Sequence, residues 1–309
     1  MAVGAQLVAI PDPNFKTILL NASSNIGIAS NGLSAIQIDT NNNGEIEQSE
    51  ALTVIELRVG GANISDLTGI EAFTNLKLLN VAGNLLTSIN VSTLTQLETL
   101  GTFHNQLTAI DLSANVNLIY FQCKSNQLTQ LDFSALPHLK WVNCQDNVLS
   151  SLDFSNNPLF EDLSCMNNPN LTSIKIKNGR QQVLGSQMLN PECWTTGTPN
   201  LNYICADDFE IASIQTYLSG CGGATLTIDS ACPMLETTQF STAKTTIALA
   251  PNPSNGIVRI QSENTFDEVT IYTVLGQQIA TAKLSQTQEI DLQLLPAGTY
   301  FLKLKNSKV

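Results

Sequence analysis

A leucine-containing pattern returns at nearly constant spacing through the middle of the chain. The form L-x-x-L-x-[VC]-x-x-N-x-L has four clear copies and two looser ones, which begin at Leu76, Leu97, Leu118, Leu139, Val54 and Phe160. Successive copies start 21 or 22 residues apart. One such repeat cannot bury its apolar residues alone, so neighbouring repeats have to stack, each adding one short strand to a common sheet. The pattern therefore predicts a curved, mainly β solenoid over residues 54–176.

Two further residue types repeat in step with the leucines. An asparagine occupies one repeat position in Asn84, Asn105, Asn126, Asn147 and Asn168. A buried amide can satisfy backbone groups at the bend that follows each strand, so we expect a structural asparagine ladder. Cysteines stand 21 residues apart at Cys123, Cys144 and Cys165. We expect them to be stacked, buried and unoxidised rather than to bind a metal.

Residues 54–176 resemble bacterial leucine-rich repeats of the internalin-like kind. In such solenoids the variable strand positions project from the concave face, where ligands bind. Aromatic and amide side chains gather there in the middle of this solenoid, and the candidate ligand-binding residues are Phe103, His104, Tyr120, Gln122, Lys124, Trp141 and Asn143. Exposed aromatics beside amides suit either a protein hot spot or a platform for stacking sugars. The alternative is that these aromatics only support strand pairing, in a spacer without a ligand.

Residues 39–50 match the calcium-loop pattern D-x-[DN]-x-[DN]-G-x5-E at every required position. Calcium prefers about six to eight oxygen ligands. The expected ligands are the side chains of Asp39, Asn41 and Asn43, the carbonyl of Glu45, a water-mediated contact from Glu47 and a bidentate carboxylate from Glu50. The sequence thus predicts an EF-hand-like cap with a structural calcium ion. The alternative is a metal-free turn that joins a short helix near residues 12–20 to the first repeat.

Four more cysteines follow the repeats, where an extracellular solenoid needs its apolar end covered. They are Cys193, Cys205, Cys221 and Cys232, and they predict disulfides and an oxidising destination. Four cysteines allow three pairings. We favour Cys205 with Cys221, because residues 207–218 read as a helix, which leaves Cys193 with Cys232.

The last part of the chain changes in character. A Thr/Ser-rich stretch at residues 233–246 reads as a linker. Short alternating strands follow, which we expect at residues 257–261, 268–274, 278–283, 289–292 and 300–305. Strands of this length and spacing predict a small immunoglobulin-like β-sandwich.

Three motifs of this last part are specific in combination: Ala250-Pro-Asn-Pro-Ser-Asn-Gly256, Val269-Thr-Ile-Tyr-Thr-Val-Leu-Gly276 and Leu295-Pro-Ala-Gly-Thr-Tyr-Phe301. Together they resemble the C-terminal sorting domain of the type IX secretion system of Bacteroidota. The resemblance implies a protein that this machinery exports to the medium or to the outer-membrane surface of a Gram-negative bacterium. Such domains usually end in one more strand, so we expect a truncated copy here.

Charge and motif content exclude several other classes. The net charge of −12, concentrated before residue 240, argues against a nucleic-acid partner. No apolar run is long enough for a transmembrane helix, and the first residues do not read as an intact signal peptide. His104 and His138 are the two histidines, and neither belongs to a recognisable catalytic motif. We therefore expect no enzymatic activity.

The sequence thus predicts five segments. They are an N-terminal cap (1–53), a leucine-rich-repeat solenoid (54–176), a cysteine-containing cap (177–232), a linker (233–246) and a sorting domain (247–309). We expect an exported protein that mediates adhesion by binding an extracellular protein. Binding of a carbohydrate is the alternative.

Overall fold

The computed structural model describes residues 6–182, 196–219, 226–232, 248–250, 256–262, 265–273, 278–285, 287–293, 295 and 300–305. The predicted linker, Cys193 and Cys221 lie outside these residues. The chain divides into two compact units, Met1–Pro233 and Met234–Val309. No helix in the described part of the chain is both long and apolar enough to cross a lipid bilayer.

The first unit begins with a small cap built on one buried carboxylate. Helix α1 (Pro13–Leu20) starts where Asp12 Oδ1 accepts hydrogen bonds from the backbone N–H groups of Asn14 and Phe15, at 2.9 and 3.0 Å. Such a side-chain cap satisfies donors that the first helical turn leaves free. Phe15 and Leu19 are buried. The cap also contains strand β1 (Ala29–Ser30) and helix α2 (Gln48–Ala51).

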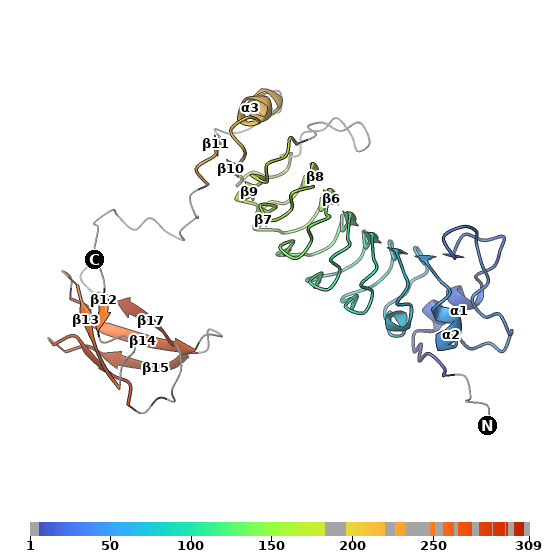
Figure 1. The fold of residues 1–309 in the computed structure, drawn as a ribbon, viewed down its shortest axis with the longest axis horizontal. Coiled ribbons are helices and arrows are strands. Elements are labelled where there is room, and N and C mark those ends of the chain that lie inside the picture. Colours follow the sequence, from blue (N-terminus) through green and yellow to red (C-terminus); the bar gives the residue numbers. More distant parts are fainter. Residues whose placement is uncertain are drawn as a thin grey trace. The chain divides into compact units, whose positions relative to one another are not determined.

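The solenoid follows, with one strand of a seven-stranded sheet in each coil. In order across the sheet the strands are β1, β2 (Glu56–Arg58), β3 (Leu78–Asn80), β4 (Thr99–Gly101), β5 (Tyr120–Gln122), β6 (Trp141–Asn143) and β8 (Asp162–Ser164). All pairs are parallel except β1 with β2. The sheet lines the inner side of a gently curved stack, and both looser sequence copies form full coils of it (Figure 1). The mainly β solenoid is confirmed.

A second, four-stranded sheet lies on the other side of the coils at the C-terminal end. Its order is β11 (Thr227–Asp229), β10 (Tyr203–Cys205), β9 (Ser173–Lys175) and β7 (Ser151–Asp153). The pairs are parallel and in register. The repeat pattern predicted one strand per coil, so this sheet was not predicted. It extends past the last clear repeat, so the C-terminal cap continues the solenoid by strand pairing.

The core of the coils is apolar and closely stacked. Each inner strand turns its central residue inward, and Leu79, Leu100, Phe121 and Val142 are fully buried. Four phenylalanine rings continue the stack, with centroid separations of 6.4 Å for Phe121–Phe133, 5.0 Å for Phe133–Phe154 and 3.7 Å for Phe154–Phe160. Dispersion between such rings adds to the stability that burial provides. A short 3-10 helix η1 (Ile70–Ala72) occupies the outer side of one coil.

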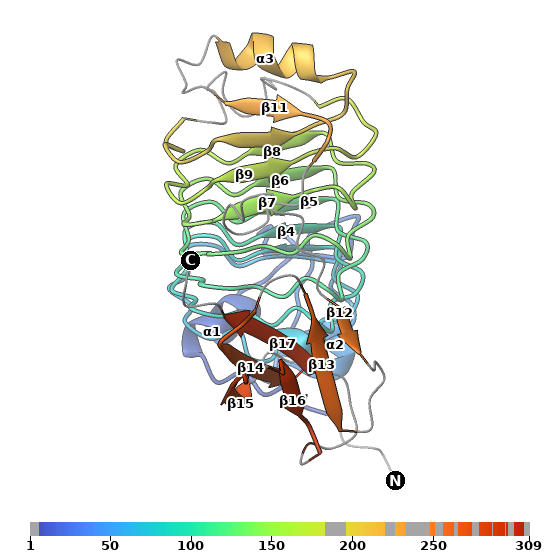
Figure 2. The same ribbon diagram turned by 90° about the vertical axis from the view of Figure 1, so that its left-hand side faces the viewer.

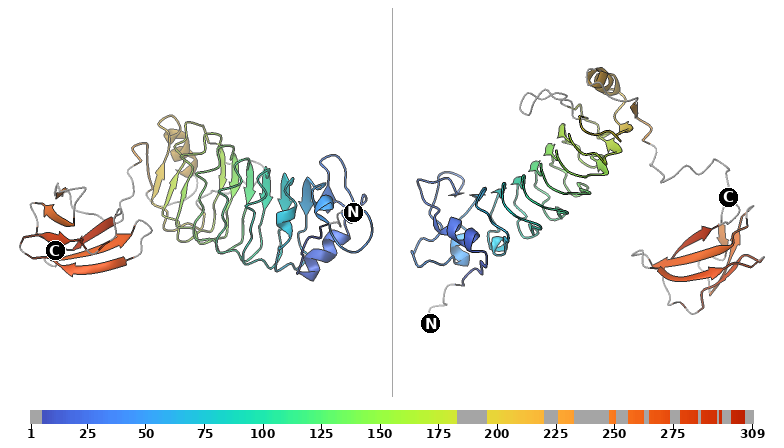
Figure 3. Two further views of the ribbon diagram at one scale, coloured as in Figure 1. Left: turned by 60° about the horizontal axis from the view of Figure 1, so that its bottom comes forward. Right: turned by 180° about the vertical axis from the view of Figure 1, so that it is seen from behind.

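Helix α3 (Ile211–Ser219) lies beyond β11 at the end of the stack (Figure 2), and the two elements are in contact. A helix was expected over residues 207–218, and α3 confirms it with a later start. The blue cap with α1 and α2 occupies the opposite end of the solenoid (Figure 3). The apolar ends of a stack of repeats need such covers, because the terminal coil has no neighbour to bury it.

The described residues of the second unit form two three-stranded antiparallel sheets. One has the order β12 (Ala248–Ala250), β13 (Ile257–Gln261), β16 (Glu289–Asp291), and the other β15 (Gln278–Lys283), β14 (Glu268–Thr273), β17 (Tyr300–Lys305). Five of these strands match the predicted ranges closely, and β12 was not predicted. Ile260 and Ile290 of the first sheet form one core with Val269 and Ile271 of the second.

Candidate binding surface

The inner sheet brings four of the predicted ligand-binding residues, Tyr120, Gln122, Trp141 and Asn143, into two rows. Because the strands pair in register, Leu78, Thr99, Tyr120, Trp141 and Asp162 form one row across the sheet. Two residues further along each strand, Asn80, Gly101, Gln122, Asn143 and Ser164 form the next row. Successive side chains of a strand point to opposite faces, so both rows face away from the core.

Tyr120 and Trp141 are direct neighbours in adjacent strands. Tyr120 is 45% exposed, an unusual degree for a tyrosine in the middle of a sheet, and Trp141 is half-buried. Exposed aromatic rings lose little conformational freedom on binding and offer a large apolar area with a polar tip. The structure therefore places these two residues as a possible anchor for a ligand.

The remaining predicted residues differ in their contacts and in how much of their side chains is exposed. Phe103 lies against His104 in an edge-to-face contact with ring centroids 5.6 Å apart. Gln122 and Lys124 are half-buried. Asn143 is only 9% exposed, so it offers a ligand little of its side chain.

The predicted Lys124 belongs to a charged network at the bends that follow the strands, and the other members of this network were not predicted. Lys124 Nζ lies 3.7 Å from Asp146 Oδ2, and Ser125 Oγ donates to the same oxygen at 3.3 Å. Asn167 Nδ2 donates to Asp146 Oδ1 at 2.7 Å. The 21-residue spacing of Ser125, Asp146 and Asn167 was the available signal, because it places them on adjacent coils.

These network residues sit at a backbone position with positive φ. The row contains Gly61, Gly83, His104, Ser125, Asp146 and Asn167, with φ between 53° and 70°. The left-handed conformation is free of steric cost only for glycine, and asparagine, aspartate and histidine tolerate it better than serine does. Side chains are thus retained here at some cost in stability.

Beneath the surface, both predicted ladders are confirmed. The Asn105 amide donates to the carbonyls of Val81 and Thr102 at 3.0 and 2.9 Å, and its oxygen accepts from Leu86 N at 3.1 Å. The other four ladder asparagines make equivalent bonds. A second, shorter set was not predicted: Asn115 donates to Val91 and Leu94, and Asn157 to Phe133 and Leu136.

Cys123, Cys144 and Cys165 are buried thiols. Burial raises the pKa of all three thiols, that of Cys165 to about 12. A thiol that stays protonated is a poor nucleophile and metal ligand. The cysteine ladder is therefore a packing feature.

Five of the six candidate calcium ligands lie in the turn between the buried Ile38 and helix α2, and the sixth, Glu50, lies within α2. Asp39 Oδ1 accepts from Asn43 N at 3.1 Å and Asp39 Oδ2 from Gly44 N at 2.9 Å, so this carboxylate holds the turn together. Gly44 has a φ of 80°, as the sharp bend requires. Glu45 forms an ion pair with Lys16 of α1, with Nζ and Oε2 2.7 Å apart.

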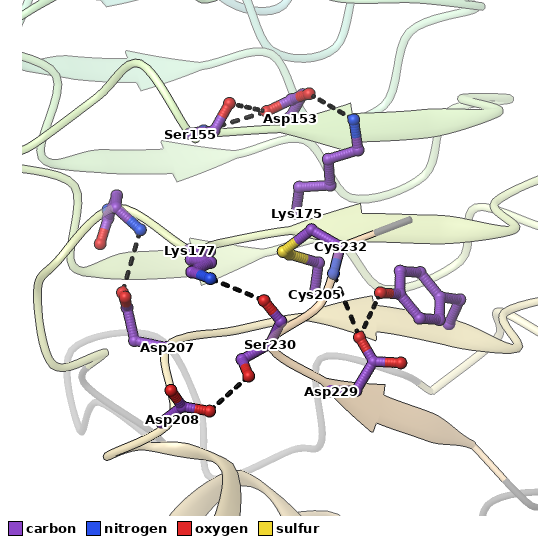
Figure 4. Close-up of a disulfide and its surroundings, with 12 residues drawn as sticks. Asp153, Ser155, Lys175, Lys177, Cys205, Asp207, Asp208, Asp229, Ser230 and Cys232 are labelled. Carbon is purple, nitrogen blue, oxygen red and sulfur yellow. Dashed lines mark hydrogen bonds and ion pairs between the residues drawn. A yellow bond between two sulfur atoms is a disulfide. The ribbon is translucent and has the colours of Figure 1, made fainter. Parts of the chain in front are cut away.

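In the C-terminal cap, Cys205 forms a disulfide with Cys232 (Figure 4), and their Cα atoms are 5.1 Å apart. The expected pairings of Cys205 with Cys221 and of Cys193 with Cys232 are therefore wrong. Strand β11 pairs in parallel with β10, with Asp229 beside Cys205, and the chain reaches Cys232 three residues later. The prediction assumed that the helix returns the chain to Cys205. Instead, strand β11 returns it, by pairing with β10.

Hydrogen bonds around the disulfide reinforce the same closure (Figure 4). Tyr203 Oη donates to Asp229 Oδ1 at 2.6 Å, Lys177 Nζ donates to the Ser230 carbonyl at 2.6 Å, and Asp208 accepts from Ser230 Oγ. Cys232 N also donates to Asp229 Oδ1, at 3.3 Å. The end of the first unit is thus bound to β10 and to the residues after β9.

Comparison with known families decides the nature of the second unit. Residues 248–309 match the secretion system C-terminal sorting domain. The second unit is such a sorting domain. The predicted resemblance of this part is confirmed, and the sorting domain indicates a secreted or cell-surface protein.

Among solved structures, similar chains are leucine-rich-repeat proteins. The functional domain of InlJ from Listeria monocytogenes, described as including a cysteine ladder, is 26% identical with a TM-score of 0.46. The match covers 67% of this chain and 44% of that one, so this chain spans less than half of the InlJ domain. Internalin InlF of the same organism is 20% identical, with a TM-score of 0.41 and coverages of 74% and 72%.

A leucine-rich-repeat protein of Leptospira interrogans is 20% identical, with a TM-score of 0.35 and coverages of 60% and 51%. Because these TM-scores are low, the fold is assigned from the stacked coils of the structure and not from these similarities. Comparison with curated proteins gives no match.

Proposed function

We propose that this protein is an exported adhesin-like molecule whose solenoid binds an extracellular protein through the inner sheet. The sorting domain supports export by the type IX secretion machinery. The observation that carries the binding proposal is the side-by-side placement of the exposed Tyr120 and the half-buried Trp141 on the inner face.

Several features favour a ligand over a plain spacer. Aromatic side chains that only supported strand pairing could be covered by their neighbours, whereas Tyr120 is 45% exposed to solvent. The neighbouring left-handed turns carry side chains where the first coils have glycine. Charged groups at the rim of an aromatic anchor match the composition of protein hot spots. A sugar ligand remains the second candidate, because the half-buried amide of Gln122 lies beside the aromatic pair.

The test is a surface-binding screen of the full chain against purified extracellular proteins and a glycan array. The double variant Tyr120→Ala/Trp141→Ala should weaken a genuine interaction by about 30-fold or more, as expected for a hot spot worth about 2 kcal/mol. The matched control is Phe209→Ala, which removes an aromatic ring that is 57% exposed in the C-terminal cap.

A protein ligand that is lost in the double variant and kept in the control supports the proposal. A glycan ligand with the same behaviour supports the second candidate. Absence of any saturable ligand for the folded chain, or equal losses in the double variant and in the control, would reject recognition by the inner sheet and favour a structural spacer.

A further inference from the structure

The N-terminal cap contains a buried carboxylate oxygen that has no hydrogen-bond donor. Glu47 is only 3% exposed, and its Oε2 has no partner. Its other oxygen, Oε1, accepts from the side-chain amides of Asn43 at 2.7 Å and Asn41 at 3.1 Å. The carboxylate therefore points into the turn formed by residues 39–50. Leaving a buried carboxylate oxygen unsatisfied is costly, because nothing replaces its lost hydration.

Most of the other oxygens of this turn hold it in shape. Asn41 Oδ1 and Asn43 Oδ1 accept from the backbone N–H groups of Asn43 and Glu45, at 3.0 and 2.8 Å. Glu50 Oε1 accepts from Thr40 N at 2.7 Å and from Thr40 Oγ1 at 2.8 Å. Glu50 Oε1 thus already accepts two hydrogen bonds, whereas Glu50 Oε2 accepts one, from Glu47 N at 3.1 Å. Asn41 Oδ1, Asn43 Oδ1 and Glu50 Oε2 each keep a second lone pair with which to ligate a cation.

The donor set is made only of oxygen, which selects hard cations. Within the described residues, no three Asp, Glu, His or Cys side chains form a group that could hold a metal by themselves. An ion in this turn would have to use amide and carbonyl oxygens as well, such as those of Asn41, Asn43 and Glu45. Calcium accepts such mixed sets with irregular geometry, whereas magnesium demands a regular octahedron and keeps its water.

The turn is also connected to the rest of the cap. Val8 N donates to the carbonyl of Ile46 at 2.8 Å, and Gln48 N donates to the carbonyl of Gln6 at 2.8 Å. Ile46 is fully buried in the core of the solenoid unit. An ion that fixes this turn therefore also fixes the residues before α1 and the start of α2.

We propose that residues 39–50 bind one calcium ion, with Glu47 as a ligand inside the turn, and that the ion stabilises the N-terminal cap. Asp39, Asn41, Asn43 and Glu50 provide further side-chain oxygens, and Glu45 provides its carbonyl. Two amides stand where carboxylates would bind more strongly, so the dissociation constant is expected on the order of 10⁻⁴ to 10⁻³ M. This inference does not depend on the ligand proposed for the inner sheet.

The decisive experiment is calorimetric titration of the full chain with calcium chloride, with magnesium chloride as the comparison. One calcium site is expected, together with a rise of several degrees in Tm at saturation. Asn43→Asp adds a carboxylate at a ligand position and should tighten calcium binding by about tenfold. Asn42→Asp adds the same charge one residue earlier, outside the ligand set, and should change the affinity much less.

The conservative variant Glu47→Gln completes the test, because it keeps the size of the side chain and removes the charge. It should weaken calcium binding by about tenfold or more while leaving the metal-free protein folded. The proposal is overturned if the wild type shows no saturable calcium binding and no rise in Tm at about 10 mM calcium, well above the expected dissociation constants. Equal effects of Asn42→Asp and Asn43→Asp would also overturn it, because they would indicate general attraction to an acidic surface.

Discussion

The two ends of the solenoid are closed by different chemistry. At the N-terminal end, Asp12 joins helix α1 to the first coil: its Oδ2 accepts from Ser65 N at 2.8 Å, Ser65 Oγ at 2.9 Å and Asp66 N at 3.1 Å. At the C-terminal end, a disulfide joins Cys205 to Cys232. The first arrangement attaches a cap to a coil and depends on ionisation, whereas the second closes the C-terminal cap on itself and depends on oxidation. The same architectural need therefore makes the two ends sensitive to different conditions.

The C-terminal end has hydrogen-bonded carboxylates too, and the buried Glu210 behaves differently from Asp12. Asp207 Oδ2 accepts from Asn178 N and Gly179 N, at 3.0 and 2.7 Å, and Glu210 Oε2 accepts from Gln182 N at 3.0 Å. Burial raises the pKa of Glu210, and its two backbone hydrogen bonds do not offset this. Burial acts in the same direction on Asp12, but hydrogen bonds from Phe15, Ser65 and Asp66 outweigh it and lower its pKa to about 2. The number of hydrogen-bond donors to each carboxylate therefore decides whether its pKa is lowered or raised.

The largest expected effect tests the covalent end. Cys205→Ala with Cys232→Ala removes a link between residues 27 apart in sequence, and we expect a loss of about 3 kcal/mol in the stability of the C-terminal cap. Hydrogen exchange in β10 and β11 should accelerate by about 100-fold, while exchange in α1 stays unchanged. Because coils contact only their neighbours, the effect should remain local. Equal acceleration at both ends would contradict this comparison.

The second effect tests the ionic end. The pKa of Asp12 is lowered from 3.8 to about 2, so its contribution to stability is present above pH 4 and is lost as the pH falls towards 2. The contribution is about 2 kcal/mol. Glu210 has a raised pKa, so its protonation in mild acid favours the folded state and does not open the C-terminal end.

Hydrogen exchange of α1 between pH 2 and 6 measures this effect. Asp12→Asn should accelerate hydrogen exchange in α1 at every pH in this range and remove most of the pH dependence of that exchange. Asp66→Asn is the matched control, since Asp66 only accepts from Thr68 in an exposed turn. The idea fails if α1 keeps the same acid dependence in Asp12→Asn.

The smallest effect concerns the middle of the solenoid, which neither end controls. Ser125 has a φ of 54° in a row that begins with Gly61 and Gly83, so Ser125→Gly should relieve strain and raise stability by about 0.5–1 kcal/mol. Ser134→Gly, at a serine outside this row, should lower stability instead. The measurement is the urea midpoint of each variant. A loss of stability in Ser125→Gly would show that the hydrogen bond to Asp146 outweighs the strain.

Periodic features could be predicted from the sequence because each is repeated. The inward leucines, Asn84 and its equivalents, and the cysteines from Cys123 onward each recur at a fixed spacing, and one physical reason accounts for every copy. The strands of the sorting domain alternate clearly and were also found. The candidate anchor of Tyr120 and Trp141 followed from the same register.

Features that occur once could not be read in this way. The pairing of Cys205 with Cys232 depends on β11 adding to β10, which no local pattern of three residues reveals. The burial of Asn143 depends on what lies around it in space. Asn115 and Asn157 were missed because Leu136 occupies the position between them and breaks the period.

The cysteine ladder has a consequence for how the chain acquires its disulfide. The protein has seven cysteines, and the five others, three of them in the ladder, could compete for Cys205 and Cys232 while the chain is unfolded. Thiol exchange needs a thiolate and access, and the closed coils deny both to Cys123, Cys144 and Cys165. The order of events therefore matters for oxidation: if the coils close before an oxidant arrives, the three ladder cysteines are no longer available as wrong partners.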